Sequence, residues 1–235
     1  MKFKSLLASV LSAVFICTSA TAAVASPDTQ SLPSPKTLTY KLVNSQNQVE
    51  LWDSFSESQK ESVKSFVAHA EQKATSIQNS GLTDSQKEEE VKRLSEDEKL
   101  AVQAYFTPVS IRSEVKDSKT ALSPAANSNW VEVNNYATNV FGAVLYRWYH
   151  RVDWEYNGSN VSNVRYNYWP QTQWILWSYA GLYDQGGDYD RQNTTHTSYS
   201  QAHFKMGVGW INVQHAYPRI SVTVNNNGGY SYRTS

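Results

Sequence analysis

Residues 140–156 alternate between apolar and polar side chains over the length of a long β-strand. The even positions carry mainly apolar and aromatic groups, among them Tyr146, Trp148 and Trp154, whereas the odd positions from Arg147 onward carry charged or polar ones. Successive side chains of a strand point to opposite faces of its sheet, so this period of two gathers the aromatic groups on one face. The pattern predicts a half-buried strand that needs a second layer to cover its apolar face.

Turn signals and further strand-like segments follow it. Asn157-Gly158 is a strong hairpin signal, and residues 161–169 are expected to return as the partner strand, ended by Pro170. Later strands are expected at 174–179, 194–208, 210–213 and 220–224, with turns at 186–188 and 225–229. Six or more strands with no helical period between them predict an antiparallel sandwich, or a barrel, over residues 129–235.

Residues 54–109 carry helical signals instead. Capping boxes overlap at Ser54 and Ser56, and further helix starts are expected at Thr83 and Ser95. An amphipathic stripe with spacings of three and four runs through Val63, Phe66, Val67, Ala70, Ala74 and Ile77. The sequence therefore predicts an α+β protein, in which an N-terminal helical segment precedes the β domain.

The segments on either side of these helices look irregular. Residues 26–53 contain several Ser and Pro and are expected to form a flexible leader, and the polar residues 110–128 are expected to form a linker. A charged helical segment before a linker could be a cleavable pro-segment. The alternative that we favour is a helical layer that packs on the sheets.

Residues 1–25 have the layout of a secretory signal peptide. Lys2 and Lys4 precede an apolar run over residues 6–16, and small residues lead to Ala23-Val24-Ala25, an expected cleavage site. The run is shorter than the roughly 18 residues that a membrane span needs. We therefore expect a secreted, extracellular protein with no transmembrane segment after cleavage. Cleavage would also remove Cys17, the only cysteine of the chain.

The segment from Trp148 to Gly158 resembles a pattern in small secreted proteins of Gram-positive bacteria, W-[YK]-x-x-[IV]-D-W-x-Y-[ND]-G. A Tyr-Pro-x-Ile stretch at 217–220 and Gly228-Gly229 are similar to the same group. The resemblance covers residues 136–232 and none of the helical segment. Members of the group are functionally uncharacterised, so the resemblance implies an exported β-module and no particular chemistry. Many of these relatives carry cysteines near the strands, which this chain lacks.

Composition excludes one class of partner. The chain has 21 basic and 21 acidic residues and no net charge. Binding to nucleic acid depends on an excess of Lys and Arg that neutralises phosphates. No nucleic-acid partner is therefore expected.

Residues that could carry chemistry are few, and the sequence shows no G-x-S-x-G elbow, phosphate-binding glycine motif or H-E-x-x-H pair. Asp153 is a candidate catalytic carboxylate or sugar ligand, but we favour its pairing with Arg147 or Arg151. His150, on the apolar face, is interpreted as a hydrogen-bonded core residue. The sequence leaves enzymatic activity open and leans against it.

Metal ligands and cofactor motifs are not indicated either. His196 and His203 have opposite parity in one expected strand, and His215 lies in a later segment. Asp184, Asp188 and Asp190 surround two glycines and are interpreted as part of a turn rather than as a calcium loop. A carboxylate pair for glycoside hydrolysis could be drawn only from these three, Glu132, Asp153 and Glu155. We expect no metal and no cofactor.

The remaining functional signal is an excess of aromatic residues in the β domain, which holds seven of the eight Trp. Indole and phenol rings stack on sugar rings, and they also dominate protein-binding hot spots. The candidate ligand-binding residues are Trp148, Trp154, Tyr166, Tyr168, Trp169, Trp174 and Trp177.

These features favour a secreted, non-catalytic binding module for cell-wall or extracellular polysaccharide. The alternatives are a self-assembling surface or matrix protein, a secreted hydrolase held inactive by its helical segment, and a membrane-active toxin. The sequence makes no prediction of oligomeric state.

Overall fold

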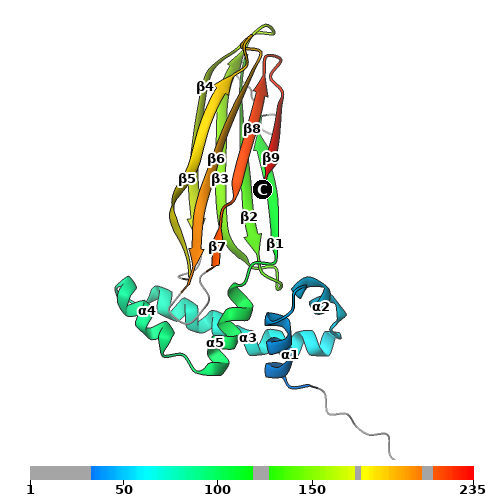
Figure 1. The fold of residues 1–235 in the computed structure, drawn as a ribbon, viewed down its shortest axis with the longest axis vertical. Helices are drawn as coiled ribbons and strands as arrows, with labels where there is room; N and C mark the ends of the chain where they lie inside the picture. The colour runs from blue at the N-terminus through cyan, green and yellow to red at the C-terminus, as the bar shows by residue number, and fades with distance from the viewer. Residues whose placement is uncertain (1–32, 119–126, 173–175, 208–213) are drawn as a thin grey trace, which may run out of the picture. The chain divides into compact units, whose positions relative to one another are not determined.

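The computed structural model describes residues 33–118, 127–172, 176–207 and 214–235 (Figure 1). The expected signal peptide, the first part of the expected leader, residues 119–126, Trp174 and the expected strand at 210–213 lie outside the described residues.

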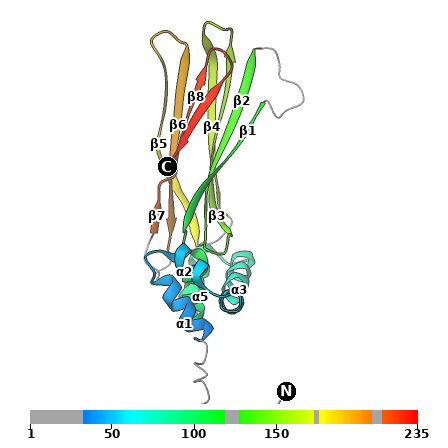
Figure 2. The ribbon, with the colours of Figure 1, turned by 90° about the vertical axis from the view of Figure 1, so that its right-hand side faces the viewer.

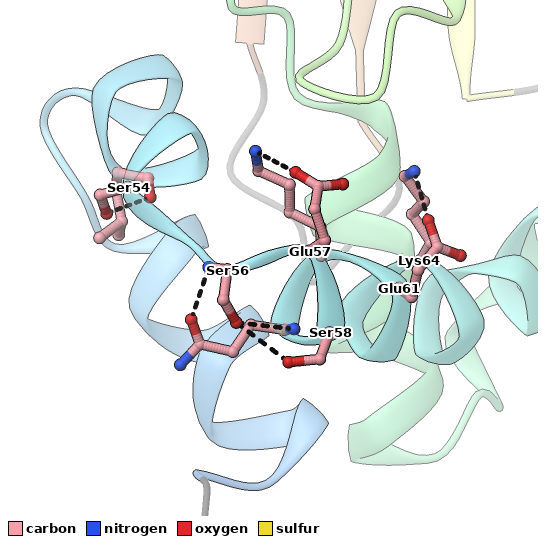
Figure 3. Close-up of polar contacts among 9 residues, drawn as sticks. Ser54, Ser56, Glu57, Ser58, Glu61 and Lys64 are labelled. Carbon is pink, nitrogen blue, oxygen red and sulfur yellow. Dashed lines mark hydrogen bonds and ion pairs between the residues drawn. The ribbon is translucent and has the colours of Figure 1, made fainter.

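Five helices come first in the described part of the chain. They are α1 (Pro35–Val43), α2 (Gln48–Ser54), α3 (Glu57–Asn79), α4 (Asp84–Lys92) and α5 (Glu96–Phe106). Capping boxes at Ser56, Thr83 and Ser95 begin the last three, as the sequence predicts. At the start of α3 the Gln59 backbone N–H donates to Ser56 Oγ at 3.3 Å, and the Ser56 N–H donates to the Gln59 side chain at 2.9 Å (Figure 3).

The prediction of a flexible leader over residues 26–53 is wrong from residue 35 onward. The Ser34 side chain caps α1, and Pro35 occupies the first turn, where its missing N–H costs nothing. Leu38 and Leu42 of this helix are buried. The Ser and Pro residues that suggested an irregular segment therefore mark a helix start. Ser54, the other expected capping residue, is instead the last residue of α2.

Nine strands form two antiparallel sheets in the described part of the chain. The four-stranded sheet has the order β1 (Ser110–Asp117), β2 (Ser128–Thr138), β3 (Val144–Tyr156) and β4 (Val161–Thr172). The five-stranded sheet has the order β5 (Trp177–Tyr189), β6 (Thr195–Met206), β8 (Arg219–Asn225) and β9 (Tyr230–Thr234), with β7 (Gln214–Ala216) paired to β6. The α+β class is confirmed, and the strands form the two separate sheets of a sandwich rather than a closed barrel.

Three local expectations about the strands are wrong. Residues 110–117 of the expected linker form β1, and β2 begins at Ser128. Pro170 lies within β4, opposite Trp148, because β4 is an edge strand in which a missing N–H is tolerated. The expected turn at 186–188 lies within β5, where the Tyr199 ring covers Gly186 so closely that an added Cβ would lie 2.9 Å from Tyr199 Cε1.

The core between the sheets follows the alternation of β3. Tyr146, Trp148, His150, Val152 and Trp154 are all buried to at least 98%. From the opposite sheet, the ring of Phe204 stacks on Tyr146 with the ring centroids 4.5 Å apart, and the hydroxyl of Ser200 accepts a hydrogen bond from Trp148 Nε1 at 3.2 Å. The prediction that even positions face a second layer is confirmed.

The helices pack on one end of the two sheets (Figure 2). The backbone carbonyl of Phe106 in α5 accepts a hydrogen bond from Trp177 Nε1 of β5 at 3.0 Å, and the carbonyl of Tyr105 accepts one from Asn139 Nδ2 at 2.6 Å. Phe106 is completely buried and belongs to the same apolar core as the strands. These contacts support the interpretation of the helices as a layer of the fold.

Candidate functional site

Three of the seven expected ligand-binding residues are core residues, and this part of the prediction is wrong. Trp148, Trp154 and Trp177 are exposed by only 0%, 2% and 1%. Trp148 and Trp154 lie at even positions of β3 and therefore face the other sheet, and Trp177 binds the end of α5. A ligand in solvent cannot reach these indole rings.

The other expected residues divide between the two faces of the four-stranded sheet. Tyr166 and Tyr168 of β4 are half-buried, and their rings pack on those of His150 and Trp148, respectively. Trp169 is 36% exposed and lies on the opposite face. Trp174 lies outside the described residues. Among the described candidates, only Trp169 is well placed to stack on a ligand.

The outer face of the four-stranded sheet, which points away from the sandwich core, gathers the polar and aromatic residues of all four strands. Cross-strand pairing places Glu114, Asn134, Tyr149 and Trp169 in one row from β1 to β4. The whole face comprises Arg112, Glu114, Lys116, Trp130, Glu132, Asn134, Tyr136, Arg147, Tyr149, Arg151, Asp153, Arg165, Asn167, Trp169 and Gln171.

A cleft of about 280 Å³ opens on this outer face. Its walls carry both charges and amides, and the aromatic ring of Tyr149 forms one side. The lining residues are Glu114, Lys116, Glu132, Asn134, Arg147, Tyr149 and Gln171. Two carboxylates face two cationic groups, so the lining of the cleft has no net charge.

Trp169 and Tyr149 form an aromatic pair at the rim of this cleft. Their rings are nearly parallel, with 5.1 Å between the centroids and 8° between the planes. The Tyr149 hydroxyl donates a hydrogen bond to Gln171 Oε1 at 3.0 Å, which fixes the ring that supports Trp169. The pair is thus a rigid platform with part of the indole open to solvent.

The two other aromatic side chains of the face are covered by guanidinium groups. Arg151 lies over the Trp130 ring at 4.4 Å, and Arg147 lies over the Tyr136 ring at 4.6 Å. Both guanidinium groups also bind carboxylates. Arg147 Nη1 donates to Glu114 at 3.3 Å, and Arg151 binds Asp153 through two hydrogen bonds of 2.9 and 3.1 Å.

Asp153 pairs with Arg151, one of the two partners that the sequence suggests for it. Its carboxylate accepts both hydrogen bonds of a planar guanidinium fork, a geometry that holds the side chain on the sheet surface. Arg147, the other expected partner, binds Glu114 on β1 instead.

Asn134 is the most unusual residue of the cleft. Only 5% of its surface is exposed, and its Oδ1 atom has no hydrogen-bond partner among the described residues. Its Nδ2 group donates to Glu114 Oε2 at 3.2 Å, which orients the amide. An unpaired buried acceptor costs free energy unless water or a ligand donates to it. The Asn134 Oδ1 atom is itself shielded from solvent, so it is an unsatisfied acceptor beneath the lining of the cleft and not a group on its surface.

Glu114, Asn134 and Tyr149 line the cleft but are not singled out by the sequence pattern. The polar composition of residues 110–117 is typical of a linker and conceals the strand that carries Glu114, and an excess of Trp and Tyr does not by itself distinguish the two faces of a sheet. One signal was available: residues 130–134 alternate Trp, Val, Glu, Val and Asn, the pattern of a strand with one polar face.

The structure separates two of the histidines of the β domain in the core and brings the other two together on the surface. His150 is fully buried, with its ring nitrogens 2.7 Å from Ser200 Oγ and 2.9 Å from Ser198 Oγ, as expected for a hydrogen-bonded core residue. Burial lowers the pKa of His150 from 6.5 to about 4, so the imidazole is neutral at pH 7. His196 is also buried, whereas His203 and His215 bind each other on the outer face of the five-stranded sheet.

The described residues contain no group of three or more His, Cys, Asp or Glu side chains arranged to hold a metal ion. Asp184 pairs with Arg219, and Asp190 accepts hydrogen bonds from the turn residues Thr194 and Thr195.

Comparisons of the chain with protein-family models, with curated proteins and with solved structures found no match. The resemblance of residues 136–232 to an exported β-module therefore stays a prediction. Of the helices in the described part of the chain, none is long and apolar enough to cross a membrane.

Proposed function

We propose that this protein is a secreted carbohydrate-binding module whose ligand is an extracellular or cell-wall polysaccharide, held on the outer face of the four-stranded sheet. The observation that carries the proposal is the partly exposed Trp169 ring, stacked on Tyr149 beside a cleft lined by amides and charged groups. A sugar offers both complements, because its ring has an apolar face for stacking and its hydroxyl groups donate hydrogen bonds.

The charges of the cleft favour a neutral or amine-bearing sugar over an anionic one. Arg147 and Arg151 are each paired with a carboxylate and packed on an aromatic ring, so much of their positive charge is balanced within the face. The groups with spare capacity are the carboxylates of Glu114 and Glu132, which accept hydrogen bonds, and the ammonium group of Lys116, which donates them. A ligand rich in hydroxyl or amino donors fits this set.

Binding to a panel of purified polysaccharides tests the proposal. The panel should include neutral glucans, chitin, peptidoglycan and an anionic polysaccharide, and binding should be measured by depletion from solution. We expect retention on at least one neutral or amine-bearing polymer. Trp169→Ala should weaken it about tenfold or more, and Gln171→Ala, at the exposed amide of the cleft, about fivefold, because one hydrogen bond contributes about 1 kcal/mol.

Tyr183→Ala is the matched control. Tyr183 is 64% exposed but lies on the five-stranded sheet, so its removal should leave binding unchanged. Absence of retention across the whole panel would refute the proposal, as would equal losses in Tyr183→Ala and Trp169→Ala.

Hydrolysis is a second candidate function, because two carboxylates line the same cleft. Glu114 pairs in register with Asn134, and Glu132 is two residues away on that neighbouring strand. Such diagonal neighbours have Cα atoms about 7–8 Å apart, within reach of the carboxylate separations of glycosidases. Release of reducing ends from a bound polymer, abolished by Glu132→Gln, would establish it; binding without release would leave the module non-catalytic.

A further inference from the structure

Two histidines face each other on the outer face of the five-stranded sheet, the sheet opposite to the cleft. His203 lies on β6 and His215 on β7, where it pairs in register with Lys205. His203 Nε2 and His215 Nδ1 are 2.7 Å apart. His215 is exposed and His203 is half-buried, so the pair is open to solvent.

The hydrogen bond between the rings uses one N–H and one lone pair. When the donor ring instead carries its proton on its other nitrogen, His203 Nε2 and His215 Nδ1 each present a lone pair to the space between the rings. Bonds between a transition metal and an imidazole nitrogen are about 2.0–2.1 Å long. Two such nitrogens are therefore about 2.9 Å apart at adjacent corners of a square-planar site, and about 3.3 Å apart in a tetrahedral site. The 2.7 Å separation is close to the first of these values.

Tyr217 packs on both rings, more closely on His203 than on His215, whose ring centroid is 6.4 Å from that of Tyr217. Tyr217 stacks on His203, with 4.7 Å between the centroids and 11° between the planes, and Tyr183 packs its ring edge against Tyr217 at 4.9 Å. His203 is thus the better oriented of the two rings, and a turn of the more exposed and less closely packed His215 would let the two imidazoles share an ion. Lys205, next to His215, opposes the approach of a cation.

We propose that His203 and His215 bind one divalent transition-metal ion in place of the proton that now joins them. Imidazole suits Cu²⁺, Ni²⁺ and Zn²⁺, and the order of affinities for such ligands places Cu²⁺ first. Water molecules would complete the coordination, since the pair lies at the surface. The hard ions Mg²⁺ and Ca²⁺, which prefer oxygen ligands, should not bind there.

Titration of the full chain with Cu²⁺, Zn²⁺ and Mg²⁺, followed by calorimetry and by the visible spectrum of Cu²⁺, tests the proposal. We expect a saturable Cu²⁺ site of one equivalent with imidazole ligands, weaker Zn²⁺ binding and no Mg²⁺ binding. His203→Gln and His215→Gln should each weaken Cu²⁺ binding at least tenfold, and the double variant should lose little more. Lys205→Gln should strengthen it about two- to fivefold.

His69→Gln is the control, because His69 is an exposed histidine on α3, in the helical layer. It should bind Cu²⁺ as the unaltered chain does. Circular dichroism of each variant establishes that it is folded before titration. The proposal is overturned if Cu²⁺ shows no saturable binding, if both histidine variants bind it as tightly as the unaltered chain, or if His69→Gln causes an equal loss.

Discussion

Lowering the pH should destabilise this protein through His150, which the fold buries in its neutral form. The imidazole is fully enclosed between the sheets, and its two nitrogens bind the hydroxyl groups of Ser198 and Ser200. No carboxylate is among these hydrogen-bonding partners. A proton that charges the ring in the unfolded chain therefore has no favourable place in the folded one.

The size of the effect follows from the pKa of His150, which burial lowers from 6.5 to about 4. The unfolded chain binds a proton as pH falls below 6.5, whereas the folded chain does so only near pH 4. Stability from this group is therefore complete above pH 6.5 and is lost as pH falls to 4. Each pKa unit corresponds to about 1.4 kcal/mol, so the loss is about 3 kcal/mol in total and about 2 kcal/mol between pH 7 and pH 5.

The assay is urea unfolding followed by circular dichroism at pH 7 and pH 5, on the unaltered chain and on His150→Gln. Gln keeps one donor and one acceptor for the two serines but does not titrate. We expect the free energy of unfolding to fall by about 2 kcal/mol more in the unaltered chain than in the variant. Identical pH dependence in the unaltered chain and in His150→Gln would refute the reasoning.

Three further predictions concern the fold. Phe106→Ala should lower the free energy of unfolding, measured in urea, by about 3–5 kcal/mol, because the side chain is completely buried where the helices join the core. A loss below about 1 kcal/mol would show that the helices do not share the core of the sheets. Ser56→Ala should cost about 1 kcal/mol in the same assay through loss of the capping box, and Ser58→Ala, in the same turn, should cost less. Gly228→Ala should lower the melting temperature, because Gly228 has a φ of +82° and an added Cβ would lie 2.6 Å from the Tyr156 ring; an unchanged melting temperature would contradict this.

Local periodicity predicted most of the fold correctly. The alternation around Trp148 gave the buried and exposed faces of β3, and the capping boxes gave the starts of three helices, because both signals depend on residues near in sequence. Failures occurred where tertiary context changed the meaning of a local signal. Pro170 is compatible with a strand only because β4 is an edge, and Gly186 extends β5 beneath the Tyr199 ring.

The site was predicted less well than the fold. Aromatic composition identified the right kind of residue but did not distinguish the buried Trp148 from the partly exposed Trp169. What distinguishes them is whether the residue occupies an odd or an even position of its strand, because this decides which face of the sheet it lies on. The cleft also depends on the pairing of β1 with β2, which joins Glu114 to Asn134 across a long connection. No local signal reports such a pairing.

The most direct test of the proposed binding face is a nuclear magnetic resonance titration. An oligosaccharide of a polymer that the protein retains is added stepwise, and the chemical shifts of the side-chain N–H groups are followed. We predict saturable shifts of the Trp169 indole and of the Asn134 and Gln171 amides, which surround the cleft. The indole signals of the buried Trp148 and Trp177 should stay in place. Shifts confined to the five-stranded sheet, with the Trp169 and Asn134 signals unchanged at saturation, would contradict the account.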